Sequence, residues 1–505
     1  MKVSLNAICG LLILLICVSA TVSPVKNTRL YIADYENVLG TSLQLKVAST
    51  SPELAAVAET AAMNEIDRLN KILSGYDVTS EFRVWAGTKN KAVKVSPELF
   101  EVLNLFDKWR TQSGGALDAS AEVVSRVWKD AAKLNTQPTA TQLAEAVATV
   151  KRAHWSLNAT TGTATHLDDA PLMLNSFVKS YIMNKASNVA LATAGTTGIV
   201  MNIGGDIVVR GEHTEQIQVS NPKADAENDA PVAKLLISNK TIATSGNYRR
   251  GELVNGVWHS HIVDPRTGLP ADKIISATVI ADNAADAGAL ATAFNVMTPE
   301  ESVKLATTVT GAEYMIITAD GKKIESKGWK ELKMPETKAV VTKNAFAADK
   351  TWDPKYELKI NLELAQIEGM RVHRPYVAVW VVDKDKKPVR SIALWYSKPR
   401  YLNDMHDWYS AYYSQFTEAG GSVSSTTSAT RPAGKYTLKW DGKNDKGELV
   451  KLGTYTIMME VAREHGTHQL MTQEFDFTKK VKPITLPANV EVASASLEYG
   501  KKSDD

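Results

Sequence analysis

The chain is poor in cysteine. Its 505 residues include two, Cys9 and Cys17, and both lie within the first twenty positions. Lys2, the short apolar run from Ile8 to Val18 and the small residues before Thr21 predict a secretory signal peptide, residues 1–20, cleaved after Ala20. Its removal would leave a chain without a thiol. That excludes disulfides and cysteine metal sites, and it suits an oxidising compartment.

The apolar run of this leader is too short for a comfortable membrane span. A lipid anchor on Cys17 is the competing interpretation. It is disfavoured because the residue before a lipidated cysteine should be small, whereas Ile16 is large. The sequence therefore predicts an exported, periplasmic protein that is soluble after removal of the signal peptide.

The sequence also lacks an excess of charge of one sign. Lys and Arg number 58, Asp and Glu number 56, and the formal net charge is +2. No basic run is interleaved with aromatic residues, so the composition argues against nucleic-acid binding. A hydrophobic content of 44% and a charged content of 23% are those of ordinary folded protein.

Residues 25–333 mix helical and strand patterns without regular alternation, which predicts an α+β domain. Ser51 and Ser96, each followed by a proline, predict the starts of two helices. We expect further helices at 141–153, 178–191 and 285–296, and strands at 30–32, 42–47 and 313–319.

The second half of the chain follows a different pattern. Residues 334–354 have no strong periodicity and predict a linker, and 355–480 predict a small all-β sandwich. Within it, 376–382 is expected to pair with 391–395, and 436–440 with 454–462 as a hairpin. Residues 481–505 are expected to form a tail.

The segment from His259 to Gly268 concentrates titratable and rigid residues in ten positions. Its Asp-Pro-Arg-Thr-Gly portion predicts a tight turn, in which proline fixes φ and glycine is free to take a positive φ. Such a turn can point His261 into a cleft. The alternative is an ordinary hairpin corner with a surface histidine. A second segment, Ala243–Arg250, begins sixteen residues before it.

Pairs of glycines occur at two other places in the first half of the chain. Met201–Ile207 places Gly204 and Gly205 directly after a predicted strand, where backbone N–H groups can approach an anion or a ring closely. In Gly114–Asp118, the pair Gly114 and Gly115 closes the predicted helix that begins at Ser96. The alternative at each place is a plain turn or helix stop.

Taken in order, these segments resemble the FAD:protein FMN transferases, the ApbE-like family. The resemblance implies an enzyme that moves FMN from FAD to a Thr or Ser hydroxyl of an acceptor protein and releases AMP. It implies His261 as the catalytic residue that helps to deprotonate the acceptor hydroxyl, a role that its ordinary pKa of about 6.5 suits. The residues expected around FAD are Leu39, Tyr76, Ala116, Leu117, Asp118, Asn175, Lys179, Tyr181, Asn202, Gly204, Gly205, Asp206 and Val263.

The resemblance also implies Mg²⁺, and here the chain departs from the family pattern. Ser180 replaces a glycine, Asn184 replaces an aspartate, and Gly288 stands where a metal-binding Asp would lie four residues before Thr292. The ligands that remain are Thr292, the Val178 carbonyl and a nearby carboxylate. That carboxylate is Asp286, provided that it caps the helix and turns inward, or alternatively Asp282. Gly288→Asp is expected to tighten the site.

The β domain resembles a domain of unassigned function that is often fused to these transferases. In it, 424–430 follows the spacing of the family's acceptor motif, Asp-x-x-Thr/Ser-Gly-Ala-Thr/Ser, with Ser424 and Ser428 as departures. Thr430 is therefore a possible self-acceptor, although a flexible loop is the simpler interpretation. Two other functions stay open: a flavin-binding or flavin-carrying protein without turnover, and a β domain that docks a partner.

Overall fold

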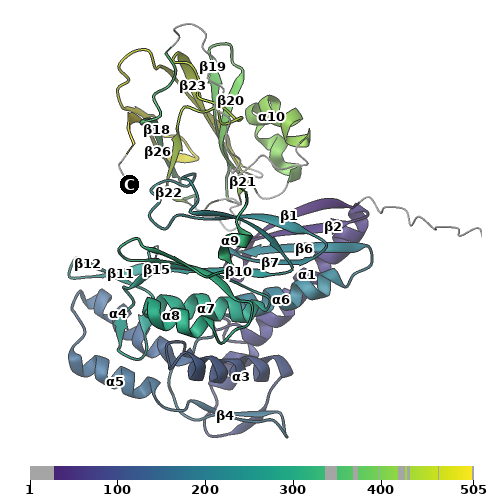
Figure 1. The fold of residues 1–505 in the computed structure, drawn as a ribbon, viewed down its shortest axis with the longest axis vertical. Helices are drawn as coiled ribbons and strands as arrows, with labels where there is room; N and C mark the ends of the chain where they lie inside the picture. The colour runs from purple at the N-terminus through teal and green to yellow at the C-terminus, as the bar shows by residue number, and fades with distance from the viewer. Residues whose placement is uncertain are drawn as a thin grey trace, which may run out of the picture.

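The computed structural model describes residues 28–248, 250–335, 350–367, 374–396, 399–418, 427–428, 431, 433–463 and 466–502. The predicted signal peptide and most of the predicted linker lie outside these residues. Figure 1 shows two domains. In the first, helices cover one face of a large sheet, and the second, built mainly of strands, lies on the opposite side of that sheet. No helix in the described part of the chain is long and apolar enough to cross a membrane.

An antiparallel sheet of eight strands organises the N-terminal domain, in the order β1-β2-β6-β7-β10-β15-β16-β17. Successive side chains of a strand point to opposite faces. Accordingly, Met201 and Val279 lie in one hydrophobic core, and their neighbours Val200 and Ile280 lie in another. The strands are β1 Arg29–Val38, β2 Thr41–Ser49, β6 Thr196–Ile203, β7 Asp206–Gly211, β10 Thr241–Gly246, β15 Ile274–Ala281, β16 Glu313–Thr318 and β17 Lys323–Glu325.

Helices α1, α6 and α7 pack together and against one face of this sheet. Ser51 and Ser96 cap α1 and α3 as predicted, since each hydroxyl accepts a backbone N–H of the first turn. The helix predicted at 178–191 has those bounds. The helices are α1 Pro52–Leu73, α2 Glu81–Ala86, α3 Pro97–Gln112, α4 Glu122–Leu134, α5 Ala140–Val150, α6 Val178–Leu191, α7 Ala284–Val296, α8 Pro299–Ala306 and α9 Trp329–Leu332.

Short hairpins complete the domain. The pair β8 Thr214–Val219 and β9 Ala233–Ser238 contributes to the second core together with the buried Trp329. A three-stranded sheet and two further hairpins lie at the edges: β3 Ala92–Lys94, β4 Trp155–Asn158, β5 Thr163–His166, β11 Gly251–Val254, β12 Val257–Ser260, β13 Val263–Asp264 and β14 Leu269–Pro270. The predicted α+β class is confirmed.

The C-terminal domain is the predicted β-sandwich. One sheet has the order β22-β18-β26-β25, and the other has the order β20-β19-β23-β24 with the two-residue β21 beside β20. Trp352 and Trp440 meet between the sheets, with ring centroids 4.7 Å apart. The strands are β18 Tyr356–Leu364, β19 Tyr376–Asp383, β20 Pro388–Trp395, β21 Thr427–Ser428, β22 Gly434–Trp440, β23 Thr454–Ala462, β24 His468–Asp476, β25 Ile484–Leu486 and β26 Val492–Lys501.

Three details of the sequence prediction are wrong here. The expected tail at 481–505 contains β25 and β26, and β26 pairs with β18 along its length. The linker was expected to extend to residue 354, but Trp352 already lies in the sandwich core. The expected hairpin of 436–440 with 454–462 does not form, because β22 and β23 belong to different sheets. The sandwich also carries a 3₁₀ segment, η2 Pro399–Asp404, and a helix, α10 His406–Glu418.

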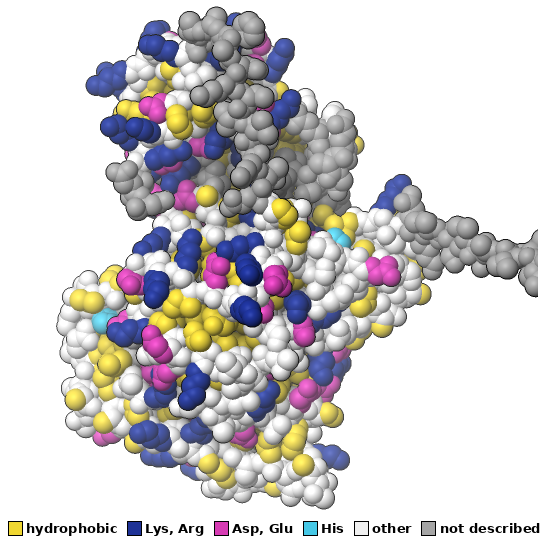
Figure 2. All heavy atoms as spheres, in the orientation of Figure 1, with side chains coloured by type: hydrophobic (Ala, Val, Ile, Leu, Met, Phe, Trp, Pro, Cys, Tyr) yellow, Lys and Arg dark blue, Asp and Glu magenta, His cyan; other side chains and the backbone are white. Residues whose placement is uncertain are grey.

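The loop 220–232 joins the two domains. Its Glu227 N–H donates to the Thr437 carbonyl at 2.8 Å. The Asn228 amide donates to the Lys439 carbonyl at 2.7 Å and accepts the Lys439 N–H at 2.8 Å. These contacts satisfy main-chain groups of β22, which lies at the edge of its sheet. On the face that Figure 2 shows, basic and acidic side chains are interspersed, in keeping with the net charge of +2.

Candidate functional site

A cleft of about 1080 Å³ lies at the ends of several strands of the N-terminal domain. Its walls come from the β6–β7 turn, the start of α6, strand β10, one side of α7 and the segment 260–263. Thirteen of the predicted site residues line it: Tyr76, Ala116, Leu117, Asp118, Asn175, Lys179, Asn202, Gly204, Gly205, Asp206, His261, Val263 and Thr292.

His261 lies on the cleft wall between β12 and β13. Its Nδ1 is 2.9 Å from the Arg250 carbonyl oxygen. A carbonyl can only accept, so Nδ1 carries the hydrogen and Nε2 carries the lone pair. Desolvation in the cleft lowers the pKa of His261 below its ordinary 6.5, and the positive charges of Arg250 and Lys129 act in the same direction. The ring is therefore a neutral base at pH 7, with its tautomer fixed.

The Asp-Pro-Arg-Thr-Gly turn forms as predicted and anchors this wall. Gly268 takes φ +78°, and its N–H donates to the Asp264 carbonyl at 2.8 Å. Arg266 holds the turn from the outside, with its guanidinium 2.8 Å from Asp264 Oδ2 and 2.9 Å from Glu301 Oε1 on α8. The Trp128 indole N–H donates to the Gly268 carbonyl at 2.9 Å. Two elements distant in sequence, α4 and α8, thus hold the turn that follows His261.

The β6–β7 turn forms another part of the cleft wall. Gly204 and Gly205 take φ +57° and +94°, and a Cβ at Gly204 would lie 2.8 Å from Thr41 Cγ2. Glycine is required there on both counts. Beyond the turn, Asp206 receives Lys179 Nζ at 3.2 Å and the Ser180 hydroxyl at 3.1 Å on the same carboxylate oxygen. The backbone of the Gly204–Gly205 turn therefore lines the cleft beside Lys179, which is paired with Asp206.

Tyr76 is an aromatic ring with little cover. Its side chain is 76% exposed although it lines the cleft. The Asn175 amide donates to its hydroxyl at 2.8 Å and so fixes one end of the ring. An exposed aromatic face held in place beside a cleft is suited to stacking on a flat ligand.

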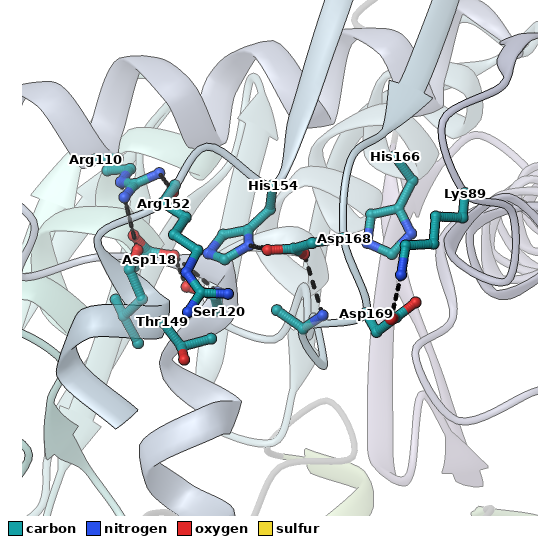
Figure 3. A network of polar contacts seen from close by, with 12 residues as sticks. Lys89, Arg110, Asp118, Ser120, Thr149, Arg152, His154, His166, Asp168 and Asp169 are labelled. Carbon is teal, nitrogen blue, oxygen red and sulfur yellow. Dashed lines mark hydrogen bonds and ion pairs between the residues drawn. The ribbon is translucent and has the colours of Figure 1, made fainter. Parts of the chain in front are cut away.

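Asp118 borders the cleft, but its carboxylate is occupied by the protein. One oxygen accepts the Ser120 N–H at 2.8 Å and the Ser120 hydroxyl at 2.6 Å. The other oxygen is 2.8 Å from Arg110 Nε, and the Asp118 side chain is buried. Figure 3 shows this group beside the His154–Asp168 pair, in which His154 Nδ1 is 3.0 Å from the carboxylate. Asp118 therefore holds the Ala116–Leu117 wall in position.

Four predicted residues do not line the cleft: Leu39, Tyr181, Val178 and Asp286. The contact of Tyr181 with FAD stays a prediction: its hydroxyl donates to Glu101 Oε2 at 2.6 Å, on α3, and the ring is buried. Leu39 lies in the β1–β2 turn with φ +50°, two residues before the cleft residue Thr41. Val178 is buried at the first position of α6.

The prediction that Asp286 turns inward as a helix cap is wrong. The cap of α7 is Asn283, whose side chain accepts two backbone N–H groups, and Asp286 lies inside the first turn. Its carboxylate is 3.5 Å from Lys108 Nζ on α3. Asp282, the alternative, is 2.6 Å from Lys240 Nζ and largely exposed. Neither carboxylate lines the cleft that contains Thr292.

The residues at the cleft do not make the Mg²⁺ site that the resemblance implies. Thr292 does line the cleft, and its hydroxyl donates to the Ser176 carbonyl at 2.9 Å. The position one helical turn before it is Gly288, which supplies no side-chain ligand atom. Among the described residues, no group of three His, Cys, Asp or Glu side chains close enough to share an ion lies at the cleft.

The sequence analysis missed several residues of the cleft. Thr244, Ser245 and Arg250 lie in the segment that the analysis singled out beside the histidine motif without assigning them to the site. Arg431 had no such signal, because it comes from the C-terminal domain. Its guanidinium is 3.2 Å from Glu227 and 5.5 Å from the centre of the Trp395 ring.

Comparison with known proteins agrees with this geometry. Residues 39–316 match the ApbE family, and residues 357–494 match a family described as predicted periplasmic protein (DUF2271). The FAD:protein FMN transferase of Haemophilus influenzae is 27% identical over 259 residues, which cover 49% of this chain and 74% of the relative. That of Klebsiella pneumoniae is 25% identical over 311 residues, 59% of this chain and 86% of the relative.

Solved structures show the same fold for the N-terminal domain. The ApbE protein of Thermotoga maritima has a TM-score of 0.54 at 24% identity, covering 61% of this chain and 100% of that chain. The flavin transferase ApbE of Vibrio cholerae has a TM-score of 0.51 at 22% identity, covering 60% and 99%. The ApbE match spans more than half of the 505 residues. The chain therefore belongs to the ApbE family, through the domain that contains the cleft, and carries a DUF2271 domain after it.

Proposed function

We propose that this chain is an FAD:protein FMN transferase that modifies a Thr or Ser hydroxyl of an acceptor protein. The acceptor oxygen attacks the phosphorus on the FMN side of the FAD pyrophosphate. A new P–O bond forms, the P–O bond to AMP breaks, and AMP leaves. The hydroxyl proton passes to Nε2 of His261. The observation that carries this proposal is the neutral, tautomer-fixed imidazole on the wall of the same cleft as the glycine turn.

The roles of the other residues follow from their contacts. The exposed ring of Tyr76 is suited to stack on a ring of FAD, and the backbone of the Gly204–Gly205 turn is suited to approach it closely. Lys179 supplies a positive charge beside the turn, and its ion pair with Asp206 orients the Lys179 side chain. The Arg266 clamp holds the turn that follows His261, so that the base keeps its position relative to bound FAD.

Magnesium is the cation that the family resemblance implies, and when bound it would neutralise charge on the pyrophosphate. Of the implied ligands, Thr292 lines the cleft, whereas Val178 does not and residue 288 carries no carboxylate, so the residues present do not fit the ion. The missing carboxylate at Gly288 favours the second candidate function, a flavin-binding protein of the same fold without turnover.

The proposed location of the protein is the periplasm. The family that matches the second domain is described as a predicted periplasmic protein. The acceptor motif implied by the resemblance is Asp-x-x-Thr/Ser-Gly-Ala-Thr/Ser. Thr430 lies outside the described residues, but the next residue, Arg431, lines the cleft. Thr430 as a self-acceptor stays a prediction from the sequence. Peptide mapping after incubation with FAD tests it: an unmodified 430 peptide beside a labelled external acceptor would contradict self-modification.

The transferase proposal is tested by mixing the chain with FAD and a peptide carrying the acceptor motif, with and without Mg²⁺. We expect a mass increase equal to covalently attached FMN, an equivalent of AMP, and loss of both products in His261→Ala. Tight FAD binding without any covalent product under either condition would instead support the flavin-binding alternative.

A further inference from the structure

Residues 180 and 288 face each other where α6 and α7 pack. A Cβ added at Gly288 would lie 2.7 Å from the Ser180 hydroxyl oxygen and 3.3 Å from both Cα and Cβ of Phe177. The first distance is below any normal non-bonded contact. Ser180 therefore occupies the space into which a side chain at residue 288 would grow.

Ser180 has little freedom to move away. It is buried in α6, and its hydroxyl donates to Asp206 Oδ2 at 3.1 Å. A helix restricts the side-chain rotamers that a serine can adopt. Rotation away from residue 288 would also break a buried hydrogen bond to a carboxylate, which is costly to leave unmade. The Ser180 hydroxyl therefore cannot easily move away to make room for a side chain at residue 288.

The position matters because residue 288 precedes Thr292 by one helical turn, and both line the cleft. A carboxylate at residue 288 would stand beside the Thr292 hydroxyl, and together they could ligate one divalent cation. The other nearby carboxylates are committed: Asp286 to Lys108, and Asp206 to Lys179 and Ser180. Asp206, the cleft carboxylate that contacts Ser180, is therefore already paired within the protein.

We propose that Ser180 closes the cation position of this cleft, so that the chain binds no divalent cation at Thr292. Lys179, 3.2 Å from Asp206, is then the fixed positive charge of that wall. The proposal concerns the FAD cleft of the proposed function, but it does not depend on turnover. It also corrects the expectation from sequence that Gly288→Asp alone would tighten a metal site, because the new Cβ meets the Ser180 hydroxyl.

The test is a Mn²⁺ titration of the full chain followed by electron paramagnetic resonance of the free ion. The four proteins are the wild type, Gly288→Asp, Ser180→Gly and the double variant. Ser180→Gly adds no ligand, and Gly288→Asp alone lacks room. We expect Mn²⁺ affinity to rise in the double variant by at least about tenfold over the other three, because only it has both the carboxylate and the space.

Gly288→Ala is the matched control, since it adds the Cβ without the carboxylate. Thermal unfolding shows whether each variant folds, and FAD titration shows whether the cleft is intact. For the wild type we expect the FAD affinity to be equal in Mg²⁺ and in EDTA. Wild-type Mn²⁺ binding that is lost in Thr292→Ala would overturn the proposal, as would a double variant that folds without gaining affinity. A wild type that binds no FAD would count against the proposed function, while the Mn²⁺ comparison would still decide this one.

Discussion

At the scale of the residue, the cleft is lined by side chains that hydrogen bonds within the protein hold in one orientation. His261 donates from Nδ1 to a backbone carbonyl, which leaves Nε2 as the acceptor. Tyr76 is exposed but tied through its hydroxyl to Asn175. Asp206 takes two donors on one oxygen. A site built in this way loses little entropy on binding, because its groups are already oriented.

The first prediction concerns pH. Desolvation lowers the pKa of His261 below 6.5, so the base is neutral at pH 7 and becomes protonated only as the pH falls. The kcat/KM for transfer is therefore expected to rise with pH through that lowered pKa and to be flat from about pH 7 upward. His261→Asn should lower the plateau by about 10²–10⁴-fold and abolish the acid limb. A pH profile unchanged by the substitution would rule out this base.

The second prediction concerns Tyr76. Tyr76→Ala should weaken FAD binding by roughly tenfold, because stacking on an aromatic ring contributes about 1–3 kcal/mol. Tyr76→Phe keeps the ring and should stay within about threefold of the wild type. Fluorescence titration of FAD measures both variants. Equal loss in the two would show that the hydroxyl contact with Asn175, and not the ring, is what matters.

At the scale of the element, the β13–β14 hairpin is the part that sets the geometry of the cleft wall. Two short strands alone would be marginal in water. Here Arg266 joins the turn to α8, and the Trp128 indole N–H joins it to α4. The Asp264 side chain is nearly buried, so the ion pair with Arg266 also compensates for a desolvated charge.

The third prediction follows from that clamp. Arg266→Ala should destabilise the N-terminal domain by about 1–3 kcal/mol, because a buried carboxylate keeps its turn N–H but loses its charged partner. It should also lower kcat more than it weakens FAD binding, because the turn positions the cleft wall that carries His261. Arg126→Ala, an exposed residue paired with Glu122 on α4, is the control and should change stability by less than about 1 kcal/mol. Denaturant unfolding and transfer kinetics give the two readouts.

At the scale of the whole molecule, the second domain contacts the first and reaches its cleft. The loop 220–232 pairs with the edge strand β22 through main-chain groups and through Asn228. Arg431, which precedes β22, then lies at the cleft with its guanidinium held by Glu227 and Trp395. The Thermotoga maritima chain is covered completely by 61% of this chain, so the first fold does not need the second domain. Among the described residues of the sandwich, Arg431 therefore lines the cleft of the first domain.

The fourth prediction tests that arrangement. Arg431→Ala should raise the KM for an acceptor peptide by roughly threefold to tenfold, since a cation at the cleft rim mainly steers an anionic partner. The FAD affinity should stay unchanged, because the residues expected around FAD all come from the first domain. Lys479→Ala, an exposed lysine of the same domain paired with Asp476, is the control. A change in FAD affinity instead would place Arg431 on the nucleotide.

The sequence by itself determined the features that are encoded within a few residues. Ser51 and Ser96 accept hydrogen bonds from their own first turns, and the turn at Asp264–Gly268 closes through its own backbone. The family resemblance that its motifs carry also pointed to thirteen residues that line one cleft.

Only the tertiary structure decided which way side chains point when their partners are distant in sequence. Asp286 faces Lys108 on α3, and Tyr181 reaches Glu101. Ser180 fills the space beside Gly288, and Arg431 enters the cleft from another domain. Local hydrogen bonds and periodicity depend on neighbours along the chain, whereas packing depends on contacts that form when distant segments meet.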